Sequence, residues 1–312
     1  METRRTFLKS GAALAAAAGA GIIGPEFAPG SPAQDKASPA GVPPSLVDSR
    51  RSAPRFKLGC AAYSYRQHLE KGKSMTLEGF IDKCAEMRLD GTELTSYYFP
   101  RTDREYLISL KRRAFLLGLD ISGTAVGNDF CRVSGPERDK DIAHVKTWVE
   151  HAALLGAGSI RIFAGNVPKG DTDEAARARA VAAIRECCEH AARHGVFLAL
   201  ENHGGITATA DQLLAICRGV DSPWFGVNLD TGNFHTEDPY ADLEKVAPHA
   251  VTVQVKVEVT PKSGKRQEAD LKRVIDMLRA VNYRGNVVLE YEAAEEPLTA
   301  VPKWIEKLRG LL

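Results

Sequence analysis

Short apolar runs alternate with amphipathic stretches along the chain from about residue 55 to its end. The apolar runs are of the length typical of buried strands, whereas the stretches between them repeat apolar residues at helical spacing. Leu77, Phe80, Ile81 and Cys84 share one such helical face. The predicted strands begin near Lys57, Leu89, Leu119, Ser159, Val196, Phe225, Val251 and Asn286.

Residues that favour helix ends agree with this pattern. Asp171 followed by Glu174, and Thr209 followed by Gln212, have the spacing of a capping box that opens a helix. Glycines commonly end helices, because they adopt the left-handed conformation without strain. Four glycines precede predicted strands in this way: Gly118, Gly156, Gly195 and Gly285.

Eight strands that alternate with helices predict a parallel sheet with both faces covered, closed into a single (β/α)8 TIM barrel. The segment 55–312 holds about 258 residues, a usual size for such a barrel. An open doubly wound sheet is the alternative. It would favour a Gly-x-Gly-x-x-Gly loop after an early strand. The segment 55–312 has no such motif, and the match at 19–24 lies in the N-terminal apolar run, before any predicted strand.

The first 54 residues have a different composition. Arg4 and Arg5 followed by the apolar run 11–23 resemble a twin-arginine export signal, which we assign to residues 1–33. The run is too short and too rich in alanine to predict a permanent membrane span. Residues 34–54 are rich in proline and predict a disordered linker. We therefore expect a periplasmic protein, with tethering by an uncleaved signal as the alternative.

The charge balance limits the partners. A formal net charge of +1 does not favour nucleic acid or an anionic membrane, since both select clustered Lys and Arg. Small neutral or mildly charged molecules fit better. The 6 cysteines fall mainly within predicted helices and strands, so we expect buried free thiols rather than disulfides.

Four of the later predicted strands end in a side chain that can bind a cation. These side chains are Glu201, Asp230, Gln254 and Glu290. In a barrel, the carboxyl ends of the strands meet on one face, where active sites lie. Oxygen donors of this kind suit a hard or borderline divalent metal such as Mn²⁺, Mg²⁺ or Co²⁺. Glu201 and Glu290 are also the predicted catalytic base and acid.

Further candidates lie close to these strand ends. The two-residue period of a strand places Lys256 beside Gln254, and Glu292 beside Glu290. Lys256 and His203 are predicted to act in catalysis. The predicted substrate-binding residues are Glu93, Arg161, Asn233, His235 and Glu292.

At these residues the chain resembles the sugar phosphate isomerase/epimerase group of the xylose isomerase-like barrel superfamily. The motifs are Gly-Thr-Glu-Leu at 91–94, Glu-Asn-His-Gly-Gly at 201–205, Asn-Leu-Asp-Thr-Gly-Asn at 228–233, Gln-Val-Lys at 254–256 and Leu-Glu-Tyr-Glu at 289–292. The resemblance implies a divalent metal, often manganese, held by Glu201, Asp230, Gln254 and Glu290. We therefore predict Mn²⁺ as the cofactor, with Mg²⁺, Co²⁺ or Zn²⁺ as alternatives. It also implies a homodimer or homotetramer. Gln254 and Asn233 depart from the family, whose ketose epimerases usually have histidine at both positions.

The first hypothesis for function is a metal-dependent isomerase or epimerase that removes a proton next to the carbonyl of a ketose or related polyol. The alternative is a metal-dependent lyase or dehydratase acting on a 3-keto-sugar, a keto-glycoside or an inosose. A third is a carbohydrate-binding barrel without catalysis. An apurinic endonuclease is disfavoured, because the strand ends lack the histidines of a three-zinc site.

Overall fold

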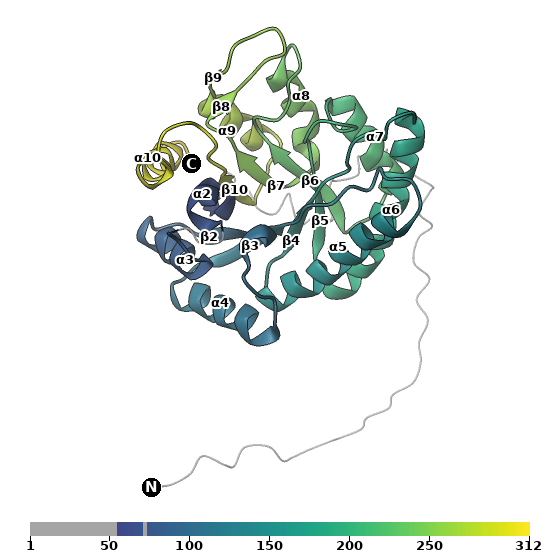
Figure 1. Cartoon of the computed structure of the whole chain (residues 1–312). Coiled ribbons are helices and arrows are strands. Elements are labelled where there is room, and N and C mark those ends of the chain that lie inside the picture. The colour runs from purple at the N-terminus through teal and green to yellow at the C-terminus, as the bar shows by residue number, and fades with distance from the viewer. Residues whose placement is uncertain (1–54, 71–73) are drawn as a thin grey trace, which may run out of the picture. The chain divides into compact units, whose positions relative to one another are not determined.

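The computed structural model describes residues 55–70 and 74–312. Eight parallel strands close into a barrel, confirming the predicted fold. Figure 1 shows these strands at the centre of a ring of helices. Around the barrel, the strand order is β1-β10-β7-β6-β5-β4-β3-β2. The strands are β1 Lys57–Ala61, β2 Gly91–Thr95, β3 Asp120–Ala125, β4 Ser159–Ile162, β5 Phe197–Glu201, β6 Phe225–Asp230, β7 Ala250–Val255 and β10 Asn286–Leu289.

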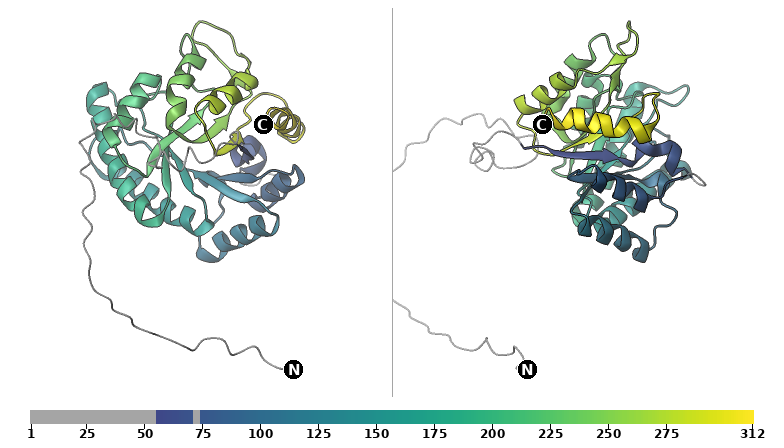
Figure 2. Two further views of the ribbon diagram at one scale, coloured as in Figure 1. Left: turned by 180° about the vertical axis from the view of Figure 1, so that it is seen from behind. Right: turned by 90° about the vertical axis from the view of Figure 1, so that its left-hand side faces the viewer.

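Helices cover the outer surface of the barrel. Seen from the side in Figure 2, α10 lies along β1, so the last helix closes the ring beside the first strand. A short hairpin of β8 Glu258–Val259 and β9 Gln267–Glu268 follows β7. The helices are α2 Arg66–Leu69, α3 Leu77–Glu86, α4 Arg104–Leu116, α5 Pro136–Leu155, α6 Asp173–His194, α7 Ala210–Val220, α8 Pro239–Val246, α9 Leu271–Ala280 and α10 Pro297–Arg309, with short 3-10 turns at Ala62–Tyr65, Ser96–Tyr98 and Ala247–His249.

One of the two predicted capping boxes is present. The side chain of Thr209 accepts from the backbone of Gln212 and the side chain of Gln212 accepts in return, so α7 opens as predicted. The prediction for Asp171 is wrong. Thr172 caps α6 instead, because its hydroxyl accepts from the backbone N–H of Ala175. The Asp171 carboxylate accepts from the backbone N–H of Thr172 and from Arg179, so it serves the loop before the helix.

The glycine predictions hold at three positions. Gly156 and Gly195 end α5 and α6 in the left-handed conformation, and Gly118 follows the end of α4 with a positive φ. Gly285 does not end a helix. After α9 the left-handed residue is Asn282, whose short polar side chain tolerates a positive φ. Gly285 comes later, where a Cβ atom would lie 2.2 Å from the Tyr283 hydroxyl, so it is required for space.

The barrel strands have two irregularities near their functional ends. The register shifts between Thr92 and Glu93 on β2, and between Val227 and Asn228 on β6. Bulges of this kind re-aim side chains and are frequent beside active sites. The extra residues are Ser122 on β3 and Val251 on β7, so the second bulge lies on the strand of Gln254, one of the predicted site residues.

The predicted free thiols are confirmed, because all 6 cysteines lie in the described part of the chain without disulfides, five of them buried. No helix among the described residues is long and apolar enough to cross a membrane. The predicted export signal at 1–33 and linker at 34–54 lie outside those residues.

Candidate active site at the carboxyl ends of the barrel strands

The four predicted strand-end residues lie on neighbouring strands. Glu201 is the last residue of β5 and Asp230 the last of β6. Gln254 is one residue from the end of β7, and Glu290 directly follows β10, with its backbone N–H donating to Val255. All four are buried, with at most 5% of each residue exposed. Three carboxyls and an amide therefore share one end of the barrel interior.

A cleft opens above these residues. It encloses about 530 Å³ of space open to solvent. Seven predicted site residues line it together with three aromatic side chains: Arg161, Glu201, His203, Asn233, Lys256, Glu290 and Glu292, with Tyr63, Tyr97 and Phe163. Its volume and lining suit a small polar molecule with a ring that stacks on aromatic groups.

Arg161 forms the first buried ion pair of the site. Its Nε lies 3.0 Å from Glu201 Oε2, and its Nη1 donates to the carbonyl of Val126 at 2.8 Å. The guanidinium also lies over the Phe163 ring, 4.0 Å from its centroid. The other oxygen of Glu201, Oε1, accepts from Asn233 Nδ2 at 2.8 Å. Both Glu201 oxygens are thus already held by neighbours.

Lys256 carries the second cationic group. Its Nζ lies 2.5 Å from Glu290 Oε2, 2.7 Å from Glu292 Oε2 and 3.2 Å from Asp230 Oδ2. Burial alone would lower the pKa of Lys256, but the carboxylates outweigh it and raise that pKa well above its usual value. The lysine is therefore an ammonium ion that contacts three acidic side chains, one at the end of β6 and two in the segment after β10.

Gln254, two residues before Lys256, forms hydrogen bonds through both the oxygen and the nitrogen of its side-chain amide. Its Oε1 accepts from Asn228 Nδ2 at 2.6 Å, and its Nε2 donates to Glu93 at 2.7 Å and to Glu290 at 3.4 Å. The opposite orientation would place the amide oxygen against the Glu93 carboxylate and two NH2 groups against each other. The hydrogen-bond network therefore assigns the donor side of the amide to the carboxyls.

Carboxyl groups outnumber cationic groups in this region, and their protonation reflects it. Burial raises the pKa of Glu93 to about 7, with Glu290 adding to the rise and Arg161 opposing it. Burial also raises the pKa of Asp230 to about 7 against the effect of Lys256. The pKa of Glu201 lies well above its usual value for the same reason, although Arg161 opposes it. Near neutral pH the site can therefore hold both protonated and ionised carboxyls.

Two histidines, His203 and His235, were predicted at this site, and they line different cavities. His203 is exposed at the rim of the cleft, where its ring packs on Phe163 with 4.3 Å between centroids. Partial burial, together with Arg161 and Lys256, lowers its pKa and favours the neutral ring. His235 faces an adjoining cavity, where its Nδ1 lies 3.0 Å from the carbonyl of Thr260.

The donor set does not fit a divalent metal as it stands. A metal at the strand ends would need oxygens from Glu201, Asp230, Gln254 and Glu290. Those of Glu201 face Arg161 and Asn233, the Gln254 oxygen faces an amide donor, and Asp230 and Glu290 contact the Lys256 ammonium. The position between the acidic groups holds a cation that the chain itself supplies.

Sequence reasoning missed two residues that organise the site. The amide of Asn202 spans β5 and β6, donating to the carbonyl of Asp230 at 2.9 Å and accepting from its N–H at 3.0 Å. Asn228 orients Gln254 from the same strand as Asp230. The two-residue strand period pointed Asn228 into the barrel with Asp230, but nothing local revealed its partner.

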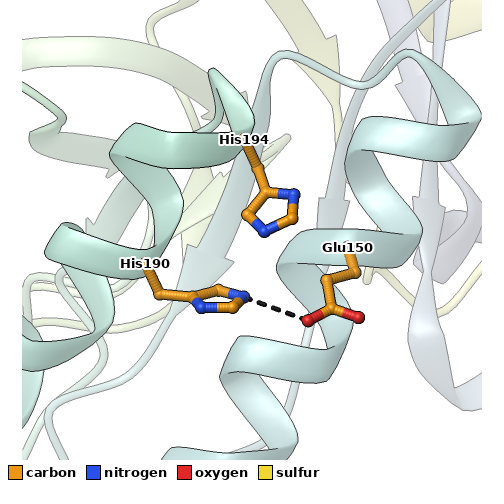
Figure 3. Close-up of side chains that lie close together, drawn as sticks. All are labelled: Glu150, His190 and His194. Carbon is orange, nitrogen blue, oxygen red and sulfur yellow. Dashed lines mark ion pairs between the residues drawn. The ribbon is translucent and has the colours of Figure 1, made fainter.

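A separate group of possible metal ligands lies on the outer helices. Figure 3 shows Glu150 on α5 turned toward His190 and His194 on α6. Their ligand atoms lie within 4.8 Å of one another, and within the described ranges no other set of three His, Cys, Asp or Glu side chains meets this condition. His190 Nε2 lies 3.2 Å from Glu150 Oε1. Packing of the two helices brings Glu150 to these histidines.

Comparison with known proteins agrees with the barrel. A family model described as Xylose isomerase-like TIM barrel matches residues 81–309. Among curated proteins, none matches the chain.

Solved structures share the fold at low identity. A xylose isomerase domain protein from Planctomyces limnophilus is 19% identical with a TM-score of 0.66, covering 83% of this chain and 98% of that one. The apo form of 3-keto-D-glucoside 4-epimerase from E. coli is 19% identical with a TM-score of 0.65, covering 82% and 100%. The IOLI protein with a bound zinc atom is 18% identical with a TM-score of 0.67, covering 82% and 96%.

Proposed function

Because the chain belongs to the xylose isomerase-like TIM barrel family, we propose that it is a sugar isomerase or epimerase that transfers a proton next to the carbonyl of a keto-sugar. A carboxylate removes the proton from the carbon beside the carbonyl, and the carbonyl oxygen takes up the electron pair as an enediolate. A carboxyl group then returns a proton to the opposite face or to the neighbouring carbon. Glu201 and Glu290 are the proposed base and acid.

The single observation that carries this proposal is the pairing of carboxyls and cations around one cleft. Glu201 lies against Arg161, and Glu290 lies against Lys256, so each proposed proton-transfer group has a cation beside it. Arg161 and Lys256 can therefore stabilise negative charge that develops on a sugar oxygen in the cleft. His203 and Glu292 at the rim are proposed to contact substrate hydroxyls, as are Asn233 and, farther out, His235.

Among the protein's structural relatives, one is named for 4-epimerisation of a 3-keto-glucoside and another holds zinc. The first supports a keto-sugar as the substrate class. Occupation of Glu201, Asp230, Gln254 and Glu290 by Mn²⁺, or by Mg²⁺, Co²⁺ or Zn²⁺, is a prediction from the sequence that the contacts of these four side chains do not favour. No step of the proposed reaction depends on it.

Proton exchange with solvent tests the proposal. The protein is incubated in D2O with ketohexoses, keto-glycosides and inosose, and deuterium next to the carbonyl is followed by NMR and mass spectrometry. We expect exchange with at least one compound and a loss of about 10² to 10⁴ in rate for Glu201→Gln and for Glu290→Gln. Glu105→Gln, an exposed acid on α4, is the matched control and should exchange like the wild type. Absence of exchange across the panel would refute the proposal.

A keto-glycoside lyase is the second candidate, because the cleft has a neighbour. A cavity of about 570 Å³ shares Asn233, Lys256 and Glu292 with the cleft and extends to His235 and Arg266. A sugar in the first space could place its aglycone in the second, with Lys256 at the bond between them. The same first step would then end in departure of the aglycone, which mass spectrometry detects as a free product.

A further inference from the structure

We propose that the Lys256 ammonium takes the place of the divalent cation at the strand ends, so that the cleft uses a cation built into the chain. This inference rests on the proposed function for its catalytic meaning, but its structural claim can be tested without any substrate. It explains why Gln254, and not a histidine, stands on β7 next to this lysine.

The position of the ammonium carries the first step of the argument. Asp230 and Glu290 are two of the four predicted metal ligands, and each has an oxygen on Lys256 Nζ, at 3.2 Å and 2.5 Å. The lysine is 6% exposed, so these contacts are shielded from water. A metal that used the same oxygens would have to expel the ammonium, and separating a buried charge from its partners is strongly unfavourable.

The chain also makes room for this lysine. A Cβ atom on Gly232 would lie 2.6 Å from Cγ and 2.7 Å from Cβ of Lys256, so only glycine leaves space for the stem. The backbone N–H of Lys256 donates to Thr231 Oγ1 at 2.9 Å, which fixes the start of the side chain. Thr231 and Gly232 directly follow Asp230, so the loop after β6 positions the side chain of Lys256.

Gln254 supplies the second step. Its donor NH2 faces Glu93 and Glu290, whereas a metal ligand must turn an acceptor toward the ion. Asn228 holds the oxygen on the opposite side. The amide thus donates to the carboxyls. It cannot turn its oxygen toward a metal as the fourth ligand without breaking three hydrogen bonds.

An ammonium can carry out the electrostatic part of the reaction. Glu292 is the most exposed of its three partners, with 39% of its side chain accessible. A substrate oxygen that displaces Glu292 would receive a hydrogen bond from Lys256 while Asp230 and Glu290 keep the ammonium in place. The electron pair of the broken C–H bond forms a C=C bond, and the C=O π pair moves onto the oxygen. The ammonium stabilises the negative charge on that oxygen, and Glu290 or Glu201 holds the proton.

Metal binding tests this directly. Mn²⁺ and Zn²⁺ are titrated by calorimetry, and bound metal is counted by mass spectrometry after dialysis. All proteins carry His190→Ala and His194→Ala, so that the outer Glu150 group adds no background. We expect no tight site in this background and one new site in the further variant Gln254→His with Lys256→Met, which completes a Glu, Asp, His and Glu set.

The outcomes separate the possibilities. Tight metal binding in the background protein that Asp230→Asn removes would overturn the inference. So would a folded Gln254→His, Lys256→Met variant, checked by circular dichroism, that binds no metal. If that variant does not fold, the background titration alone decides. Failure of the proposed function would appear differently, as absent deuterium exchange with the metal result unchanged.

Discussion

Glu93 is a fully buried carboxyl at the floor of the site, and the barrel disfavours its charge. Its pKa of about 7 in the folded protein lies above the value of 4.5 expected for an exposed carboxyl, because burial and Glu290 penalise ionisation. The protonated form therefore stabilises the fold fully below pH 4.5, and this contribution is lost as the pH rises through about 7.

Glu93→Gln removes this titration. Relative to the wild type, we expect the variant to gain about 2 to 4 kcal/mol in free energy of unfolding between pH 4.5 and pH 8, as the wild-type penalty develops. Urea unfolding at a series of pH values measures the difference. A pH-independent difference between the two proteins would contradict the assignment. Glu105→Gln, which lies on the surface, should show no such trend.

Arg161 and Glu201 form a buried ion pair whose disruption leaves a charge without a partner. Arg161→Met should lower the free energy of unfolding by about 3 to 5 kcal/mol. The comparison is Arg113→Met, which removes an exposed pair with Asp82 and should cost less than about 1 kcal/mol. Adding Glu201→Gln to Arg161→Met should recover part of the loss. Equal losses of unfolding free energy for Arg161→Met and Arg113→Met would show that burial does not raise the cost of breaking the pair.

Gly232, in the loop after β6, leaves room for the side chain of Lys256, which directly follows β7. In Gly232→Ala the new Cβ would also meet the carbonyl oxygen of Glu258 at 2.9 Å, which is backbone and cannot move freely. We expect a loss of about 1 to 3 kcal/mol in the free energy of unfolding, and slower deuterium exchange because Lys256 is displaced. Gly158→Ala is the control, since a Cβ there meets nothing within 4 Å. Wild-type exchange in Gly232→Ala would argue against a role for the lysine's position.

At the level of β5 and β6, Asn202 acts as a clasp between two strand ends. Asn202→Ala removes both of its hydrogen bonds to the Asp230 backbone, in a buried setting. A loss of about 1 to 3 kcal/mol is expected, and Asp230 should shift relative to Lys256. Asn202→Asp keeps an acceptor toward the Asp230 N–H but sets a buried carboxyl against the Asp230 carbonyl, so thermal unfolding should show it to be no more stable than Asn202→Ala. An Asn202→Ala variant as stable as the wild type would contradict the clasp.

Export of the full chain is a proposal that rests on Arg4, Arg5 and the apolar run 11–23, all outside the described residues. Replacing both with lysine should keep the protein in the cytoplasm, because the twin-arginine route recognises the pair. Cell fractionation with an antibody to the barrel domain measures this. Unchanged export of the lysine variant would refute the twin-arginine assignment. A slower-migrating membrane fraction of the wild type would instead indicate an uncleaved signal.

The sequence by itself determined the strands and their order, because apolar runs and turn residues are local signals that each segment carries alone. It also predicted a candidate site at the strand ends, since the carboxyl ends of parallel strands meet on one face. The starts of most strands were predicted within one residue. The largest error is at β2, predicted near Leu89 and observed at Gly91, because apolar Leu89 precedes the Asp90-Gly91 turn pair and not the strand itself.

Only the tertiary structure decided which groups pair within that site. The contacts of Lys256 with Asp230 and Glu290, and the amide orientation of Gln254 between Asn228 and Glu93, join strands that are far apart in sequence. Charge compensation in a buried space depends on distances between such strands, and no local pattern encodes them. The sequence could therefore place a cation at the strand ends, but the packing decided that the chain itself provides one.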